Sequence, residues 1–264
     1  MLIRVALLFA LGMGSQAAQQ DPAVLGLATF LHIVSDLDQS VAFYHGTLGL
    51  EFTGHAVSPE AIDSHPVANM YGVPGQKYRA VVVKVPGSSL NIELVQWGPA
   101  RKPAHDQVAD PGAITLILRR TDPANAGAML HDPDGFPVQI IQGNTPGAGL
   151  SISVTDIAKT SRIFADLLGF RPEGDGFTGP GAPVHIRLTR ATSRNGLAVP
   201  FPSSGRGSLR LSAHNIAGLA HNLIAAGLTV VTTGGEPVTL PYNGPQAIIL
   251  RSQDSFALQL VEAK

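Results

Sequence analysis

The chain has 264 residues, of which 44% are hydrophobic and 14% are charged. At roughly 100 to 200 residues per domain, this length predicts one large domain or two ordinary ones. The 18 basic and 19 acidic residues balance, and no run of Lys or Arg could neutralise a row of phosphates, which argues against nucleic acid as a partner. The absence of Cys excludes thiol nucleophiles, disulfides and cysteine-bound zinc or iron–sulfur clusters.

Residues 1–17 have the pattern of a secretory signal peptide. Arg4 is followed by an apolar run from Val5 to Met13, and Ser15 and Ala17 are small residues placed for cleavage after Ala17. A membrane anchor is the less favoured alternative, because the run is shorter than the roughly 20 residues that cross a bilayer. We therefore expect an exported protein, periplasmic or secreted, that is free of the membrane after cleavage.

The remaining chain repeats itself at an offset of 120 residues. VSDLDQSVAFYHGTLGLEF from Val34 matches VTDIAKTSRIFADLLGFRP from Val154, and DPDGFPVQII from Asp132 matches SQDSFALQLV from Ser252. Two blocks in one register indicate a duplication. We predict a first domain at 25–145 and a second at 148–264, divided in the Gly/Pro-rich stretch 143–149.

Local patterns predict an α+β fold of four strand–helix–strand–strand–strand units, two in each half. In the first half, Asp36 begins a helix that Gly49 ends, and a hairpin follows at 78–85 and 90–97. Further strands are expected at 114–120 and 136–142, separated by the turn that begins at Asp132. The second half adds a helix after Asp156, a strand at 208–215, a helix at 216–227, and strands at 228–233, 246–252 and 256–262.

The two halves differ in one place. The first half has no room for a helix between residues 120 and 132, and its surplus length lies at 55–77. We expect this insert, with its apolar residues, to cover the strand face that the missing helix would expose, unless the second domain or another subunit of a homodimer covers it. The alternative is a mobile lid over a cleft. The insert residues are Ala61, Ile62, Val67, Met70 and Tyr71, and the strand residues are Ile114, Leu116 and Leu118.

The segment 32–52, the strand IELVQWG and the turn DPDGFPVQI together resemble the vicinal oxygen chelate superfamily. This superfamily holds glyoxalases, extradiol dioxygenases, epimerases, and fosfomycin and bleomycin resistance proteins. The resemblance covers nearly all of the chain after residue 17. It implies paired βαβββ modules whose curled sheets form an open barrel around a cleft, and it leaves the reaction open.

The resemblance also implies a candidate metal site, in which one residue from each of four strands holds a divalent ion. Glu93 aligns with the acidic ligand of IELVQWG and shares a strand face with Asn91 and Trp97. Glu93 is therefore the candidate catalytic residue, as a ligand or a proton shuttle. The alternative is a structural ion pair of Glu93 with Arg79, Arg101 or Arg119.

The other positions depart from the family's pattern. The usual first-strand ligand aligns with Thr29, and His32 lies on the opposite strand face unless a bulge turns it inward. The third position aligns with Ala113, which cannot bind a metal, and the fourth holds Gln139. The candidate metal ligands are therefore Glu93, His32 and Gln139. The candidate substrate-binding residues are Trp97, Asn91 and Arg119.

The second half has no carboxylate at the places that match the metal positions, which hold Gly149, Leu197 and Gln259. We therefore expect the functional cleft in the first domain only.

Three classes of function are open at this point. The first is an enzyme of lyase, isomerase or dioxygenase type that uses one divalent ion, with Zn, Fe, Mn and Ni not distinguished. The second is a metal-free protein of the bleomycin resistance type that binds or sequesters a small molecule. The third is a structural role in which side chains fill the clefts. No phosphate-binding loop or dinucleotide motif is present, so no nucleotide cofactor is expected.

Overall fold

The computed structural model describes residues 23–54, 57, 60–98, 108, 110–122, 126–181, 183–193, 201–241 and 243–263. The predicted signal peptide at 1–17 lies outside this part of the chain. No helix among the described residues is both long and apolar enough to span a membrane.

The helices begin where the sequence predicts them. Asp36 accepts hydrogen bonds from the amides of Asp38 and Gln39, and Asp156 accepts one from the amide of Lys159. Each of these caps stabilises a short α-helix that continues into a turn of π-helix. The helices are α1 (Leu37–Val41), η1 (Ala42–Thr47), α2 (His65–Met70), α3 (Ile157–Arg162), η2 (Ile163–Leu167) and α4 (Ile216–Ala225).

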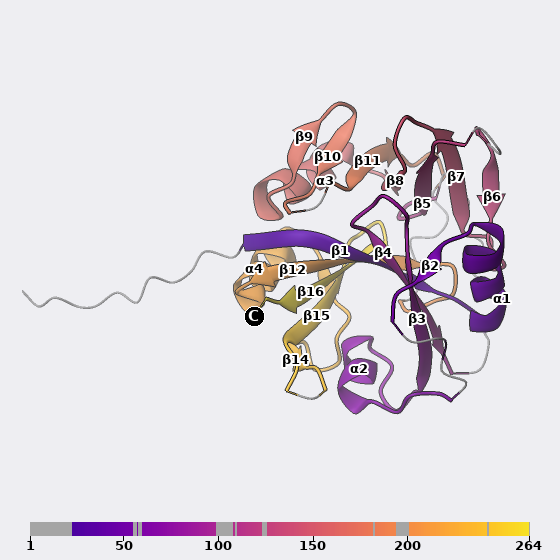
Figure 1. The fold of residues 1–264 in the computed structure, drawn as a ribbon. Helices are drawn as coiled ribbons and strands as arrows, with labels where there is room; N and C mark the ends of the chain where they lie inside the picture. The colour runs from indigo at the N-terminus through magenta and orange to yellow at the C-terminus, as the bar shows by residue number, and fades with distance from the viewer. Residues whose placement is uncertain are drawn as a thin grey trace, which may run out of the picture.

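The strands form two curled, open sheets, which confirms the predicted α+β class (Figure 1). Sheet A has the order β13 (Thr229–Val230), β15 (Gln246–Arg251), β16 (Ala257–Glu262), β12 (Gly207–His214), β1 (Ala23–Ile33), β4 (Asn91–Trp97), β3 (Tyr78–Lys84) and β2 (Glu51–Phe52), and β14 (Val238–Thr239) pairs with β15. Sheet B has the order β6 (Met129–His131), β7 (Pro137–Gln142), β5 (Ile114–Arg120), β8 (Gly147–Val154), β11 (His185–Arg190), β10 (Gly176–Thr178) and β9 (Arg171–Glu173).

Each sheet combines strands from both halves of the chain. In sheet A, β1 pairs antiparallel with β12, and in sheet B, β5 pairs antiparallel with β8. The first unit thus joins the fourth, and the second joins the third. Strands from 25–145 and from 148–264 therefore share both sheets, since β1 and β5 of the first range pair with β12 and β8 of the second.

The main hydrophobic core lies between the two sheets, together with inward-facing residues of α1, η1, η2 and α4 (Figure 1). Ile114, Leu116 and Leu118 belong to this core. The expectation that the insert covers them is therefore wrong. The strand face is buried because the two sheets and the helices between them enclose it.

The insert instead covers the opposite face of sheet A. Its helix α2 places Met70 and Tyr71 in a second hydrophobic cluster with sheet A residues such as Trp97. The backbone of α2 is tied to the last unit of the chain, since the Thr233 amide donates to the Asn69 carbonyl and the Thr232 hydroxyl donates to the Met70 carbonyl, at 2.9 and 3.0 Å. Figure 1 shows α2 on the side of sheet A away from sheet B.

Candidate functional site

Four neighbouring strands of sheet A bring polar residues to the face beneath α2. Thr29 of β1 pairs with Arg210 of β12, and Arg210 pairs with Gln259 of β16. Glu93 of β4 pairs with Leu31, two positions after Thr29. Because side chains alternate along a strand, these four polar side chains share one face of the sheet.

An ion pair joins the two halves at this floor. The Nη2 atom of Arg210 contacts Oε2 of Glu93, and Nε of Arg210 donates to Oε1 of Gln259 at 3.0 Å. Only 27% of the Arg210 side chain and 17% of the Glu93 side chain are exposed. Burial opposes the charge on Arg210, yet the Glu93 carboxylate and Tyr71 raise the pKa of the guanidinium above its usual value.

A cavity of about 220 Å³ opens above the ion pair. Met70 and Tyr71 of the α2 segment form part of its wall, and the Trp97 ring packs at a tilt against Tyr71 and Tyr78, with ring centroids 4.9 and 5.0 Å away. Burial, followed by the Glu93 charge, raises the pKa of the Tyr71 hydroxyl far above its usual range, so this group stays neutral. The buried indole N–H of Trp97 has no hydrogen-bond partner among the described residues.

The structure brings together some of the predicted site residues. Glu93 and Trp97 line the cavity, while Asn91 lies at the start of the same strand, outside the lining. Gln139 and Arg119 belong to β7 and β5 of sheet B. Glu93 is thus not joined by Gln139, because the two strands lie in different sheets.

The ion-pair alternative for Glu93 is correct in kind, but its partner differs from those expected. Arg79 pairs with Asp38 at 2.9 Å, Arg119 lies in sheet B, and Arg101 is outside the described residues. The partner is Arg210, which comes from the second half, as do the lining residues Leu240, Gln259 and Val261. The cavity that Glu93 lines is therefore built by residues of both halves rather than by the first domain alone.

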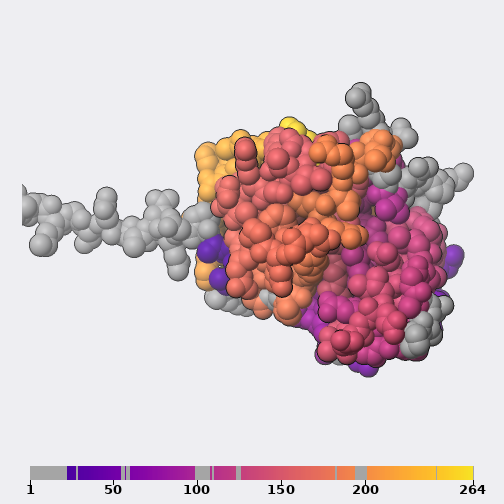
Figure 2. Space-filling model, turned by 90° about the horizontal axis from the view of Figure 1, so that it is seen from above, coloured from indigo at the N-terminus to yellow at the C-terminus, as the bar shows by residue number. Residues whose placement is uncertain are grey.

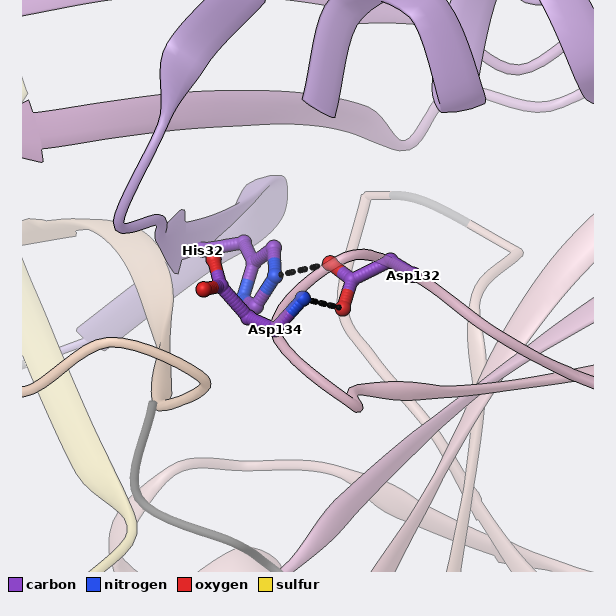
Figure 3. A group of neighbouring side chains, drawn as sticks. All are labelled: His32, Asp132 and Asp134. Atoms are coloured by element: carbon purple, nitrogen blue, oxygen red, sulfur yellow. Dashed lines mark hydrogen bonds and ion pairs between the residues drawn. The ribbon is translucent and has the colours of Figure 1, made fainter. Parts of the chain in front are cut away.

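His32 lies on the face of β1 that points into the main core, as strand alternation predicts. Its Nε2 atom is 2.7 Å from Oδ2 of Asp132 (Figure 3). Its Nδ1 atom is 3.3 Å from the carbonyl oxygen of Arg206. The His32 and Asp132 side chains are fully buried. Burial opposes ionisation of Asp132, but the charge and hydrogen bond of His32 outweigh it and lower the pKa of this carboxyl.

His32, Asp132 and Asp134 are the one group of three that could hold a metal ion within the described part of the chain. Every carboxylate oxygen of the group already accepts a hydrogen bond. Oδ1 of Asp132 accepts from the amides of Asp134 and Phe136 at 2.9 and 2.8 Å, and Oδ2 also accepts from the Tyr44 hydroxyl at 3.2 Å. Asp134 accepts from the amide and hydroxyl of Ser35.

Part of this group recurs in the second half, as hydrogen bonds between Thr155 and Asp254. The amide and hydroxyl of Thr155 donate to Asp254 at 3.2 and 2.6 Å, as those of Ser35 do to Asp134. At the same offset, His32, Tyr44 and Asp132 are replaced by Ile152, Phe164 and Ser252. The buried His32–Asp132 pair thus connects sheets A and B and has no equivalent at the matching positions of the second half. A metal ion would have to displace the hydrogen bonds of this pair.

A resident metal ion does not fit the floor of the sheet A cleft either. A metal ligand must offer a lone pair, whereas a guanidinium has only N–H donors and carries a positive charge. Arg210 already holds both Glu93 and Oε1 of Gln259, the two groups that could ligate an ion. Chemically, the floor can donate hydrogen bonds from Arg210 and accept them at Glu93.

No protein-family model matches the chain. Among curated proteins, the protein named cramped-like from Mus musculus is 38% identical over 133 residues, which cover 49% of this chain and 10% of that protein. The chain therefore spans only about a tenth of the length of this relative.

Several solved structures share the fold over most of the chain. Glyoxalase I from Zea mays is 14% identical, with a TM-score of 0.58, and the match covers 91% of this chain and 92% of that one. A candidate dioxygenase from Bacillus subtilis is 16% identical, with a TM-score of 0.52 and coverage of 91% and 86%. The cppA protein from Streptococcus pneumoniae is 12% identical, with a TM-score of 0.51 and coverage of 91% and 100%. At these identities, the likeness concerns the fold alone.

Proposed function

Since the chain has the fold of the vicinal oxygen chelate superfamily, we propose that the sheet A cleft binds a small oxygen-bearing molecule without a resident metal ion. The observation that carries this proposal is the position of Arg210. Its guanidinium lies between Glu93 and Gln259, on the floor where the family resemblance implies an ion. A guanidinium presents up to five N–H donors and can orient ligand oxygens, as a cation would.

The charges of the floor indicate which ligands fit. Arg210 and Glu93 compensate each other, so a ligand with a net charge would leave one of them unbalanced in a partly buried site. A neutral molecule that carries an oxygen acceptor and a neighbouring hydroxyl donor satisfies both groups. The aromatic wall formed by Tyr71, Tyr78 and Trp97 favours an apolar or planar body next to these oxygens.

The proposal selects the metal-free alternative among the functions that the sequence leaves open. A metal-dependent lyase or dioxygenase needs open coordination positions on its ion. The Arg210 side chain stands where such an ion would lie, and it supports binding of a small molecule rather than metal-dependent catalysis. If the bound molecule is also converted, Glu93 is the group that can accept its proton, because Glu93 is the carboxylate that lines the cavity.

Fluorescence provides a direct test, because Trp97 is the only tryptophan of the chain and lines the cavity. We would titrate the protein with a panel of neutral hydroxy ketones, diols and phenols, together with matched carboxylates, and record the Trp97 emission. We expect saturable quenching by a neutral member of the panel that is lost in Arg210→Ala and kept in Arg119→Ala. Equal quenching in wild type and Arg210→Ala would contradict the proposal.

We also propose that the protein is exported. The proposal rests on the sequence of residues 1–17 alone, and intact mass measurement of the protein recovered from secreting cells tests it. A mature chain that begins at Ala18 is expected, whereas a full-length chain retained inside the cell would contradict export.

A further inference from the structure

Sheet B carries a second groove that differs in charge from the sheet A cleft. A cavity of about 210 Å³ lies over its middle strands and is lined by residues that include Arg119, Gly149, His185 and Arg187. Figure 2 shows the molecule from above, where residues of the sheet B strands and their connections form much of the visible surface. This groove is therefore separate from the cleft beneath α2.

Glycines on the central strand make room for the basic side chains on either side. Arg119 of β5 pairs with Gly147 of β8, and Gly149 pairs with His185 of β11. A Cβ atom on Gly147 would lie 3.6 to 3.9 Å from the Arg119 guanidinium, and a Cβ atom on Gly149 would lie 2.9 Å from the His185 carbonyl oxygen. The floor between the two basic strands is thus bare backbone.

The strand register shows that charge is reversed relative to sheet A. Glu93 pairs with Leu31, and Arg187 pairs with Ser151, which corresponds to Leu31 at the offset of 120 residues. Arg187 therefore takes the place of Glu93. Leu197, the residue that sequence alignment places there, lies outside the described residues.

The carboxylate of Asp175 balances the positive charge of this groove only in part. Asp175 is 67% exposed and lies 3.5 Å from Arg187 and 3.7 Å from His185, distances at which an exposed ion pair contributes little. The Nε atom of Arg187 is buried and has no hydrogen-bond partner among the described residues. Arg119 forms no ion pair within that part of the chain, so the two guanidinium groups outnumber the one carboxylate in the lining.

We infer that this groove binds a small oxyanion, a phosphate or a carboxylate group, between Arg119 and Arg187. Two guanidinium groups can each donate two N–H bonds to the oxygens of such an anion. The bare floor at Gly149 allows the anion to approach the sheet, and the size of the cavity limits the ligand to a few non-hydrogen atoms. The inference is independent of the sheet A cleft, since the two sites share no lining residue.

Calorimetric titration with inorganic phosphate, and separately with succinate, tests the inference. We expect saturable binding of at least one anion, weakened at least tenfold in Arg187→Ala and in Arg119→Ala, and weakened as salt is added. Arg190→Ala is the matched control, because Arg190 is an exposed arginine at the end of the same strand and is not in the lining. Arg210→Ala should bind the anion as wild type does.

Conservative variants guard against unfolding. Arg119→Lys and Arg187→Lys keep the charge, so each should bind more tightly than the matching alanine variant if the groove is the site. The absence of saturable binding in the wild type, or equal binding in wild type and both alanine variants, would overturn the inference. Binding of phosphate but not succinate would assign the site to phosphate groups, and the reverse would assign it to carboxylates.

Discussion

Arg210 and Glu93 come from opposite halves of the chain and form an ion pair within sheet A. The pair exists because β12 and β4 lie on either side of β1 in sheet A. It places a permanent cation at the centre of the cleft. The proposed function depends on this relationship, since it assigns to the Arg210 guanidinium both the place of a metal ion and the donors for a ligand.

The first prediction concerns the stability that this pair provides. Breaking a buried ion pair by removing one partner costs about 3 to 5 kcal/mol, and the residual exposure of both side chains places this pair at the lower end. We expect Glu93→Ala and Arg210→Ala each to lower the free energy of unfolding in urea. The double variant should lose less than the sum of the two. Additive losses would contradict an energetic link between the two residues.

Local patterns in the sequence predicted the elements well. The caps at Asp36 and Asp156, the β3–β4 hairpin and strand β5 lie where the sequence placed them. Each depends on residues close together in the chain, so propensity, capping and alternation are sufficient to define it. The position of His32 on the core face of β1 follows from the same alternation.

The pairing between units could not be predicted in this way. Two similar halves offer β1 equivalent partners within and across the halves, and the choice depends on contacts distant in sequence. Arg210 was missed for this reason. The signal was present in the segment SLRLSAHN, where Arg210 shares a strand face with Ser208 and Ser212 rather than with the leucines, but nothing in the sequence placed that strand beside β1.

The second prediction concerns the buried His32–Asp132 pair. Asp132→Asn should lower the free energy of unfolding at neutral pH by about 3 to 5 kcal/mol, because it leaves His32 without its carboxylate. The matched control is Ser252→Ala at the corresponding place in the second half, where the buried hydroxyl has no hydrogen-bond partner among the described residues. This control should change stability little.

The pH dependence of the stability difference between wild type and Asp132→Asn follows from the lowered pKa of Asp132. A carboxyl whose pKa is lower in the folded state adds stability above its unfolded value of 3.8, and this stability is lost as the pH falls through the folded value. The gap between wild type and Asp132→Asn should therefore narrow below pH 3.8. Burial, with a smaller contribution from the Asp132 charge, raises the pKa of Asp134, which acts in the opposite sense, and the burial contribution is present in both proteins. A gap that stays constant down to pH 2 would refute this reading.

The third prediction compares the two helix caps. Asp36→Ala and Asp156→Ala should each lower stability by about 0.5 to 2 kcal/mol. Asp36→Ala should lose more stability than Asp156→Ala. The Asp36 carboxylate accepts hydrogen bonds from two amides and from the Gln39 side chain, whereas that of Asp156 accepts one from an amide. Thermal unfolding gives the ranking, and Trp97 fluorescence titration should show unchanged ligand affinity. A loss of ligand binding without a change in melting temperature would show that the caps act in another way.

The fourth prediction concerns the attachment of α2. Gly72 has a φ of +69°, and a Cβ atom there would lie 2.7 Å from the Val231 carbonyl oxygen. Gly72→Ala should therefore destabilise the protein and weaken binding in the cleft by displacing Tyr71. Gly75→Ala is the control, because its φ of +77° imposes a similar backbone strain of about 1 to 2 kcal/mol with no atom within 4 Å. Equal effects of both substitutions on stability and binding would contradict the close contact.

Metal analysis is the most direct test of the central claim that Arg210 replaces a metal ion. The purified protein would be loaded with Zn, Mn, Ni or ferrous iron, dialysed and analysed for bound metal, beside Glu93→Ala and Arg210→Ala. We predict that wild type retains no stoichiometric ion in the cleft, so its metal content equals that of Glu93→Ala. One ion per wild-type chain that is lost in Glu93→Ala would contradict the claim.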